Sequence, residues 1–357
     1  MSFFGGALNR IGRFWDRIRH KVKPGLSGSS PVAIQPYRTF GRRDWVFIQG
    51  RVLKDKGIRF REKDRFWHNF MNTLKRFNSD EIADVPLELK IGKRLFNIRT
   101  DQEGYFKFET ALLPALSVGY QDPFYKYTVG LPDNPDVKEV QAEICIPGPA
   151  RFGVISDIDD TVLYSAVTSR LKIQMLYLTF MKNAITRRAF REVSAFYRAL
   201  ASDAFARNPF FYVSNSPWNL YDLLDDFLRL NRLPKGPILL RDFGISYKNR
   251  PPGYHGHKLD TILRIIETYP ELDFVLIGDS GERDADIYLQ VAAQYPKRIK
   301  AIYIRDVLER RRARRIRKLI AETWGVEVLL VTNFAEAARH ASDIGLLDWG
   351  TFLAARE

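Results

Sequence analysis

The sequence has a single cysteine, Cys145, among 357 residues. One cysteine allows no intramolecular disulfide and no metal cage of several thiolates, which suits a reducing, cytoplasmic setting. Long apolar runs are also missing, because the run 175–181 is bracketed by Lys172 and Lys182 and falls far below the roughly 20 residues of a membrane-spanning helix. The first residues lack a signal-peptide layout, since their apolar side chains alternate with arginines. We therefore expect a cytoplasmic protein that does not span a bilayer.

Acidic residues are in the minority, with 42 Asp and Glu against 56 Lys and Arg and a formal net charge of +14. Such a surface attracts polyanions, and the charge alone is compatible with nucleic acid or with anionic lipid. Hydrophobic residues make up 45% and charged residues 27% of the chain, a composition typical of globular proteins with a packed core. The length suits two domains.

Residues 1–24 have the pattern of a basic amphipathic helix. Its apolar side chains recur at spacings of three and four and are separated by basic ones: Phe4, Leu8, Ile11, Trp15, Ile18 and Val22. We expect this face to lie on an anionic membrane surface, with packing on the protein itself or on a second subunit as the alternative. Residues 25–34, rich in Ser and Gly, are predicted to form a flexible linker.

Residues 35–149 contain short β-rich runs, and an antiparallel sandwich with one inserted helix near 66–77 is the simplest packing. After the break at 147–149, residues 150–357 alternate between strand and helix patterns. This alternation predicts an α/β fold, a parallel sheet with helices on both faces. Ligands of such sheets bind at the carboxyl ends of the strands, so functional motifs are expected there.

The first strand of this second part, 152–156, runs directly into Asp157, Asp159 and Asp160. A carboxylate at a strand end can attack phosphorus, and splitting hydrolysis through an aspartyl-phosphate makes each displacement easier. Asp157 is the candidate nucleophile, and Asp159 is the candidate acid and base that protonates the leaving alkoxide and then activates water. Asp-rich turns without catalysis are common, so this motif does not decide the function alone.

Two further strand and helix ends carry groups suited to phosphate. Ser214 and Asn215 follow the strand 210–213, and Pro217 is expected to open a helix there. Their hydroxyl and backbone N–H groups can hold phosphate oxygens, although a simple helix cap has the same pattern. Lys258 begins another predicted helix, where a cation is unfavourable to the helix dipole. Holding Asp157 and the transferred phosphoryl group together would explain it.

The strand 274–278 ends in Asp279, and Asp284 follows in the same acidic turn. Hard oxygen ligands with room for water and phosphate are what magnesium prefers, and Asp279 with Asp157 would provide them. Asp284 is expected to complete the site directly or through water. One acidic turn is weak support, but four motifs in this order, each with a matching role, indicate a single phosphoryl-transfer site.

These motifs resemble those of the haloacid-dehalogenase phosphohydrolase superfamily. More narrowly, DIDDTV at 157, SNSPWNL at 214, LLRDFG at 239 and IGDSGE at 277 resemble the actin-patch-type phosphatidate phosphatase family. The likeness covers roughly 150–310 and implies a Rossmann-like, magnesium-dependent phosphatase acting on phosphatidate.

The resemblance implies a role for each matching position. Asp157 is the nucleophile and Asp159 the acid and base. The implied phosphate ligands are Thr161, Ser214, Asn215 and Lys258. The implied metal ligands are Asp157, Asp159 through its carbonyl, Asp279 and Asp284.

We therefore predict a lipid phosphate phosphatase working from the cytoplasm at an anionic membrane surface, with a phospholipid substrate and Mg²⁺ as cofactor. A phosphatase for nucleotides or nucleic-acid ends is the alternative among enzymes. A membrane-binding adaptor with little catalysis is the alternative outside them, and the complete set of Asp157, Asp159, Lys258 and Asp279 argues against it. The basic run 310–318 is interpreted as a solvated helix face, with anionic lipid or RNA as alternative ligands.

Overall fold

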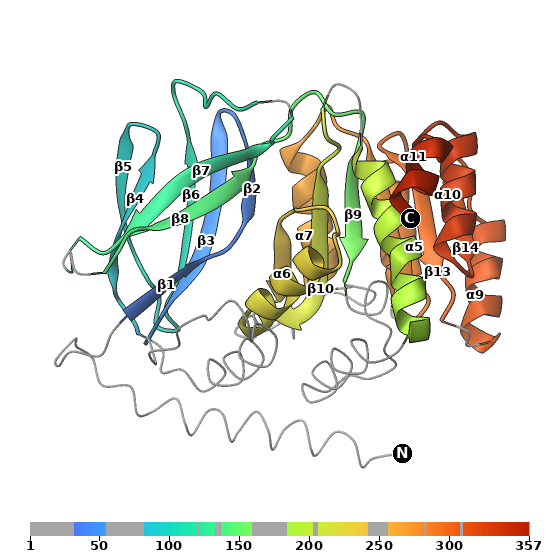
Figure 1. Cartoon of the computed structure of the whole chain (residues 1–357), viewed down its shortest axis with the longest axis horizontal. Helices are drawn as coiled ribbons and strands as arrows, with labels where there is room; N and C mark the ends of the chain where they lie inside the picture. Colours follow the sequence, from blue (N-terminus) through green and yellow to red (C-terminus); the bar gives the residue numbers. More distant parts are fainter. Residues whose placement is uncertain are drawn as a thin grey trace, which may run out of the picture.

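The computed structural model describes residues 32–54, 82–119, 121–132, 134, 137–158, 184–202, 206–241, 256–281, 283–307 and 310–356. Figure 1 shows an open β structure beside an α/β unit. The amphipathic helix predicted for 1–24 and the inserted helix predicted near 66–77 both lie outside the described residues.

The β part is an eight-stranded sheet in the order β1-β3-β2-β8-β7-β4-β5, with β6 paired to β3. Its strands are β1 (Val32–Pro36), β2 (Thr39–Arg42), β3 (Trp45–Lys54), β4 (Pro86–Ile91), β5 (Arg94–Arg99), β6 (Tyr105–Ala111), β7 (Phe124–Gly130) and β8 (Val140–Cys145). All pairs are antiparallel except β2 with β8. Buried residues of β3 and β6 pack with those of β4, β7 and β8 in one core, so the sheet folds over a single apolar core.

Strand β1 begins inside the range predicted as linker. Val32 and Ile34 are buried and alternate with more exposed residues, and the strand pairs with β3 along its whole length. Burial of this apolar alternation on one face of the sheet accounts for the strand.

The α/β part is a six-stranded, wholly parallel sheet in the order β11-β10-β9-β12-β13-β14. The strands are β9 (Gly153–Asp157), β10 (Phe210–Pro217), β11 (Ile238–Arg241), β12 (Phe274–Asp279), β13 (Ile299–Arg305) and β14 (Glu327–Val331). The α-helices are α5 (Ala184–Ala201), α6 (Tyr221–Leu230), α7 (His257–Thr268), α8 (Asp284–Gln294), α9 (Arg310–Ala321), α10 (Phe334–Asp343) and α11 (Trp349–Arg356). The predicted α/β class is confirmed.

The helices cover both faces of this sheet. Residues of α5, α6, α10 and α11 form one core with the side chains on one face of the strands, such as Val154. Residues of α7, α8 and α9 form a second core with the other face, such as Ile155. Both faces of each central strand are therefore apolar, as expected for a buried parallel strand. No helix among the described residues is long and apolar enough to cross a membrane.

The local structure after β10 refines the prediction. Pro217 is the last residue of β10 and the N-cap residue of a short 3-10 helix, η2 (Trp218–Leu220), which leads directly into α6. The register of β10 against β11 shifts between Val213 and Pro217, so the strand remains extended through an irregular stretch that contains Ser214 and Asn215.

Candidate active site

Asp157 is the last residue of β9, a central strand of the parallel sheet. Its neighbours hold it on both sides, because Val213 of β10 pairs with Asp157 and Ile277 of β12 pairs with Ser156. The Asp157 side chain is completely buried. A carboxylate at this position needs positive charge or hydrogen-bond donors close to it, because an uncompensated charge is costly to bury.

Lys258 supplies that compensation. It is the second residue of α7, and its side chain is 1% exposed. Its Nζ lies 2.8 Å from Asp157 Oδ1 and 2.6 Å from Asp284 Oδ1. The helix can begin here because Gly256, with φ of 71°, takes a left-handed backbone conformation that glycine adopts without strain. One ammonium group thus bridges two buried carboxylates.

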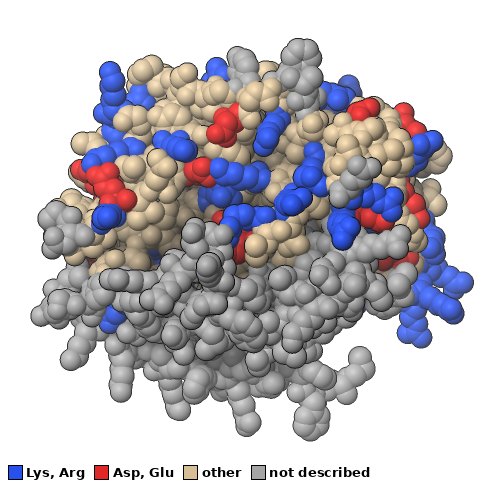
Figure 2. Space-filling model, in the orientation of Figure 1, with Lys and Arg blue, Asp and Glu red and all other residues tan. Residues whose placement is uncertain are grey.

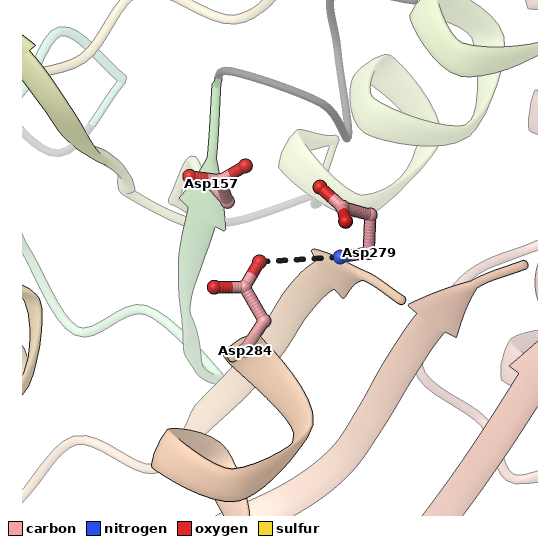
Figure 3. Close-up of side chains that lie close together, drawn as sticks. All are labelled: Asp157, Asp279 and Asp284. Atoms are coloured by element: carbon pink, nitrogen blue, oxygen red, sulfur yellow. Dashed lines mark hydrogen bonds between the residues drawn. The ribbon is translucent and has the colours of Figure 1, made fainter. Parts of the chain in front are cut away.

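Asp279 and Asp284 come from the end of β12 and the start of α8. Asp284 Oδ2 accepts a hydrogen bond from the Asp279 backbone N–H at 3.2 Å, and Asp279 accepts one from the Gly281 N–H. Figure 3 shows the carboxylates of Asp157, Asp279 and Asp284 gathered at the ends of β9 and β12. One oxygen from each lies within 4.8 Å of the others.

This group fits a divalent metal ion. All three residues are buried and offer hard oxygen atoms, the donors that Mg²⁺, Ca²⁺ and Mn²⁺ prefer. Besides Lys258, Arg305 adds a positive charge at the same edge, because this buried residue pairs in register with Asp279. A phosphate dianion arriving beside three carboxylates would call for additional positive charge, which a metal supplies.

Ser214 and Asn215 lie one and two positions past the β10 residue that pairs with Asp157. The Ser214 side chain is buried, and its Oγ accepts a hydrogen bond from the Ser216 N–H at 2.9 Å. Asn215 is exposed. The hydroxyl is therefore held by its own turn next to the carboxylates, while the amide faces solvent.

The structure brings together four of the predicted site residues, namely Asp157, Lys258, Asp279 and Asp284, with Ser214 on the adjacent strand. Asp159 and Thr161 lie outside the described residues. His257 contacts Thr261 on its own helix and does not belong to the acidic group.

The sequence did not reveal two residues whose hydrogen bonds hold the backbone of Asp157 in place. The Ser156 hydroxyl donates to the Asp157 carbonyl at 2.9 Å and lies 2.8 Å from the Tyr197 hydroxyl of α5. Burial raises the pKa of Tyr197, so this phenol stays neutral and can serve as a hydrogen-bond partner. The available signal was a serine in an otherwise apolar strand.

Gly278 was also missed. A Cβ at this position would lie 2.5 Å from Asp284 Oδ2 and 2.7 Å from Tyr288 Cε2. The absence of a side chain therefore lets α8 approach β12 closely enough for Asp284 to reach Lys258. A glycine in a buried strand is the signature of such a close approach.

Comparison with known proteins identifies this region. Residues 152–306 match the family model "Phosphatidate phosphatase APP1, catalytic domain", a range that contains all the site residues described above. This region is similar to the catalytic domain of that phosphatase family. The phosphatidate phosphatase APP1 of Saccharomyces cerevisiae is 34% identical over 158 residues, 44% of this chain and 26% of that protein. The matched range covers the strands β9 to β13 of the α/β part.

Two other proteins are similar over longer stretches. An uncharacterised protein of Schizosaccharomyces pombe is 29% identical over 265 residues, 69% of this chain and 41% of that protein. The chain thus spans 26% and 41% of the lengths of its two curated relatives. A carbohydrate acetylesterase from Xanthomonas citri overlaps 88% of this chain and 74% of its own at 8% identity and a TM-score of 0.36, a likeness too weak to carry an argument.

The similarity to a phosphatase catalytic domain and the buried acidic group are both compatible with the use of a metal ion. Cys145 takes no part in such chemistry. It is buried in the second core, and burial raises its pKa to about 12, which keeps the thiol protonated at neutral pH.

Proposed function

We propose that this protein is a magnesium-dependent phosphatase of the haloacid-dehalogenase type that hydrolyses the phosphate monoester of a lipid, converting phosphatidate to diacylglycerol. The observation that carries the proposal is the bridge from Lys258 to Asp157 and Asp284. It lies at the carboxyl edge of the parallel sheet, inside the region matched to a phosphatidate phosphatase catalytic domain.

In the first step, an Asp157 carboxylate oxygen attacks phosphorus, and the bond from phosphorus to the lipid oxygen breaks. Asp159 gives its proton to the departing lipid oxygen, so that diacylglycerol leaves as a neutral alcohol. Lys258, 2.8 Å from Asp157, keeps the nucleophile in place and offsets negative charge on the phosphoryl group. Ser214 and Asn215, with Thr161, hold the other phosphoryl oxygens.

In the second step, Asp159 takes a proton from water, and the water oxygen attacks the phosphorus of the aspartyl-phosphate. The bond from phosphorus to the Asp157 oxygen breaks, which frees inorganic phosphate and restores both carboxyl groups. Asp157, Asp279 and Asp284, with the Asp159 carbonyl, would hold Mg²⁺. When bound, the ion supplies Lewis-acid stabilisation of charge on the phosphoryl oxygens.

The test is a phosphate-release assay with magnesium that compares short-chain phosphatidate, lysophosphatidate, nucleotides and DNA with terminal phosphate. Phosphatidate should be the best substrate. If nucleotides or DNA ends were hydrolysed much faster, the substrate would be a nucleotide or nucleic acid and not a lipid. The net charge of +14 is compatible with that substrate too. No release from any of them would favour the adaptor interpretation.

Two additions to this assay test the mechanism. Excess chelator should stop phosphate release and magnesium should restore it, whereas full activity in chelator would refute the metal assignment. Asp159→Asn should slow release by about 100- to 10,000-fold, and by less for substrates with good leaving groups. Equal losses for good and poor leaving groups would exclude Asp159 as the acid.

A further inference from the structure

Helix α9 (Arg310–Ala321) presents an unusually basic surface. Ala313 and Ile316 are buried against the sheet, and the helix contains no acidic residue. Every basic side chain of the helix is exposed, and we call this set the α9 basic face: Arg310, Arg311, Arg312, Arg314, Arg315, Arg317 and Lys318. Figure 2 shows Lys and Arg side chains projecting on the side of the molecule where Figure 1 places α9.

The helix lies against the loop that carries the acidic residues of the active site. Arg312 donates to the carbonyl of Gly281, which lies between Asp279 and Asp284. Arg315 pairs with Asp286 in the first turn of α8. Helix α9 also follows β13, whose last residue is in register with Asp279. The amino-terminal half of the α9 basic face is therefore fixed at the catalytic edge of the sheet.

Some residues of the α9 basic face lie near a carboxylate and others do not. Arg317 lies 3.9 Å from Asp306 and Lys318 lies 3.8 Å from Glu322. Arg310, Arg311 and Arg314, by contrast, form no ion pair with a carboxylate among the described residues.

The basic residues also repel one another within the helix. Arg310 and Arg314, and likewise Arg314 and Lys318, are four positions apart, a spacing at which like charges destabilise a helix. Packing on the sheet accounts for Ala313 and Ile316 but not for this arrangement of arginines. A bound polyanion would relieve the repulsion.

We propose that the α9 basic face docks on a lipid bilayer with anionic headgroups and so brings the catalytic edge to lipid phosphates. This inference rests on the proposed function. Charge complementarity selects the partner, because the unpaired arginines form an open, exposed face that suits a surface of many headgroups. A lipid substrate in turn must be reached at such a surface. Residues 1–24, which are also predicted to bind anionic membranes, are kept in every variant below.

The test measures binding of the full chain to phosphatidylserine vesicles by co-sedimentation. Phosphatidylserine is a phosphodiester, so binding is read without turnover. The variant is Arg310→Gln, Arg311→Gln and Arg314→Gln combined. The matched control is Lys93→Gln, Arg207→Gln and Lys297→Gln combined, which removes the same charge from exposed residues. Arg207 and Lys297 precede β10 and β13 and thus lie toward the opposite edge of the sheet.

Each arginine should contribute about five-fold to vesicle affinity, equivalent to about 1 kcal/mol. The variant should therefore bind about 100-fold more weakly, the control within about three-fold of the unaltered protein, and neither should bind phosphatidylcholine vesicles. If the variant and the control lost vesicle affinity equally, the loss would be due to net charge alone, and the proposal would be overturned. Unchanged vesicle binding, or a variant that loses binding to RNA while keeping binding to vesicles, would overturn it as well.

Failure of the proposed function would look different. The unaltered protein would then release no phosphate from short-chain phosphatidate, whatever the vesicle-binding result. The two claims are therefore tested by separate readouts on the same protein.

Discussion

The ring of Tyr37 stacks on the indole of Trp218, with ring centroids 4.5 Å apart and planes inclined by 14°. Tyr37 lies between β1 and β2, whereas Trp218 directly follows the stretch that contains Ser214 and Asn215. The next residue, Arg38, donates its backbone N–H to the Tyr221 hydroxyl at 2.7 Å. The β part of the chain thus holds the segment that follows Ser214 and Asn215.

Replacing Tyr37 should therefore disturb substrate binding as well as stability. Tyr37→Leu removes the stack and frees Trp218, and small displacements of positioning groups cost up to about 100-fold in efficiency. We expect KM for short-chain phosphatidate to rise by about 10-fold with a smaller change in kcat. The measurement is steady-state phosphate release, with the unfolding temperature recorded in parallel.

Phe40→Leu is the matched control for that variant. Phe40 is as buried as Tyr37 and packs on Phe211 and Tyr269, away from residues 214–218. It should lower the unfolding temperature by a similar amount and leave KM unchanged. If both variants raised KM equally, the stack on Trp218 would have no special role in positioning.

The second prediction concerns charge balance at the active site. Lys258→Met leaves the buried carboxylates of Asp157 and Asp284 without their shared ammonium. Removing one partner from a buried ion pair destabilises a protein by about 3–5 kcal/mol. Magnesium should recover part of this loss, because a bound cation compensates the same carboxylates.

Urea unfolding with and without magnesium checks this expectation. The increase in stability on adding magnesium should be larger for Lys258→Met than for the unaltered protein. Lys297→Met, at an exposed position, serves as control and should change neither stability nor its magnesium dependence. A Lys258→Met protein as stable as the original would contradict the role assigned to the bridge.

The third prediction concerns Gly278. The methyl group of Gly278→Ala would meet Asp284 and Tyr288 at distances that real Cβ atoms do not show. Asp284 must then move away from Lys258, and overpacking of this kind typically costs about 1–3 kcal/mol. Phosphate release should fall sharply. Gly119→Ala, whose added Cβ has no neighbour within 4 Å, should behave like the unaltered protein, and normal activity of Gly278→Ala would refute the argument.

The positions of Asp157 and Asp279 followed from the sequence because each ends a continuous apolar run, and such runs become buried parallel strands. The position of Lys258 at a helix start also followed from the sequence. The residues that hold these side chains in place could not be predicted, because they come from distant segments of the chain. Ser156 behind Asp157 and its partner Tyr197 are 41 positions apart, and no local pattern marks one as the partner of the other.

Other features were missed for local reasons. Pro217 directly precedes a helix, as predicted, but the irregular pairing of β10 with β11 up to this residue had no local signal in the sequence. The need for glycine at 278 depends on the approach of α8, which only the folded structure shows.

The fourth prediction concerns Cys145. Burial raises the pKa of its thiol to about 12, so the reactive thiolate is scarce at pH 8, far below that pKa. Iodoacetamide at pH 8 should leave both the thiol count and the phosphatase activity of the native protein unchanged, and should modify Cys145 after unfolding in urea. Rapid labelling of the native protein with loss of activity would contradict the conclusion that Cys145 takes no part in the chemistry.

The most direct test of the whole account compares the unaltered protein with Asp157→Asn. Asparagine keeps the shape of the side chain at the end of β9 but removes the charge that attacks phosphorus. The measurement is the initial rate of phosphate release from short-chain phosphatidate in magnesium, on protein shown to be folded by circular dichroism. We predict steady release by the unaltered protein and none above buffer by Asp157→Asn. Release by the variant within ten-fold of the original rate, or no release by the original protein, would contradict the account.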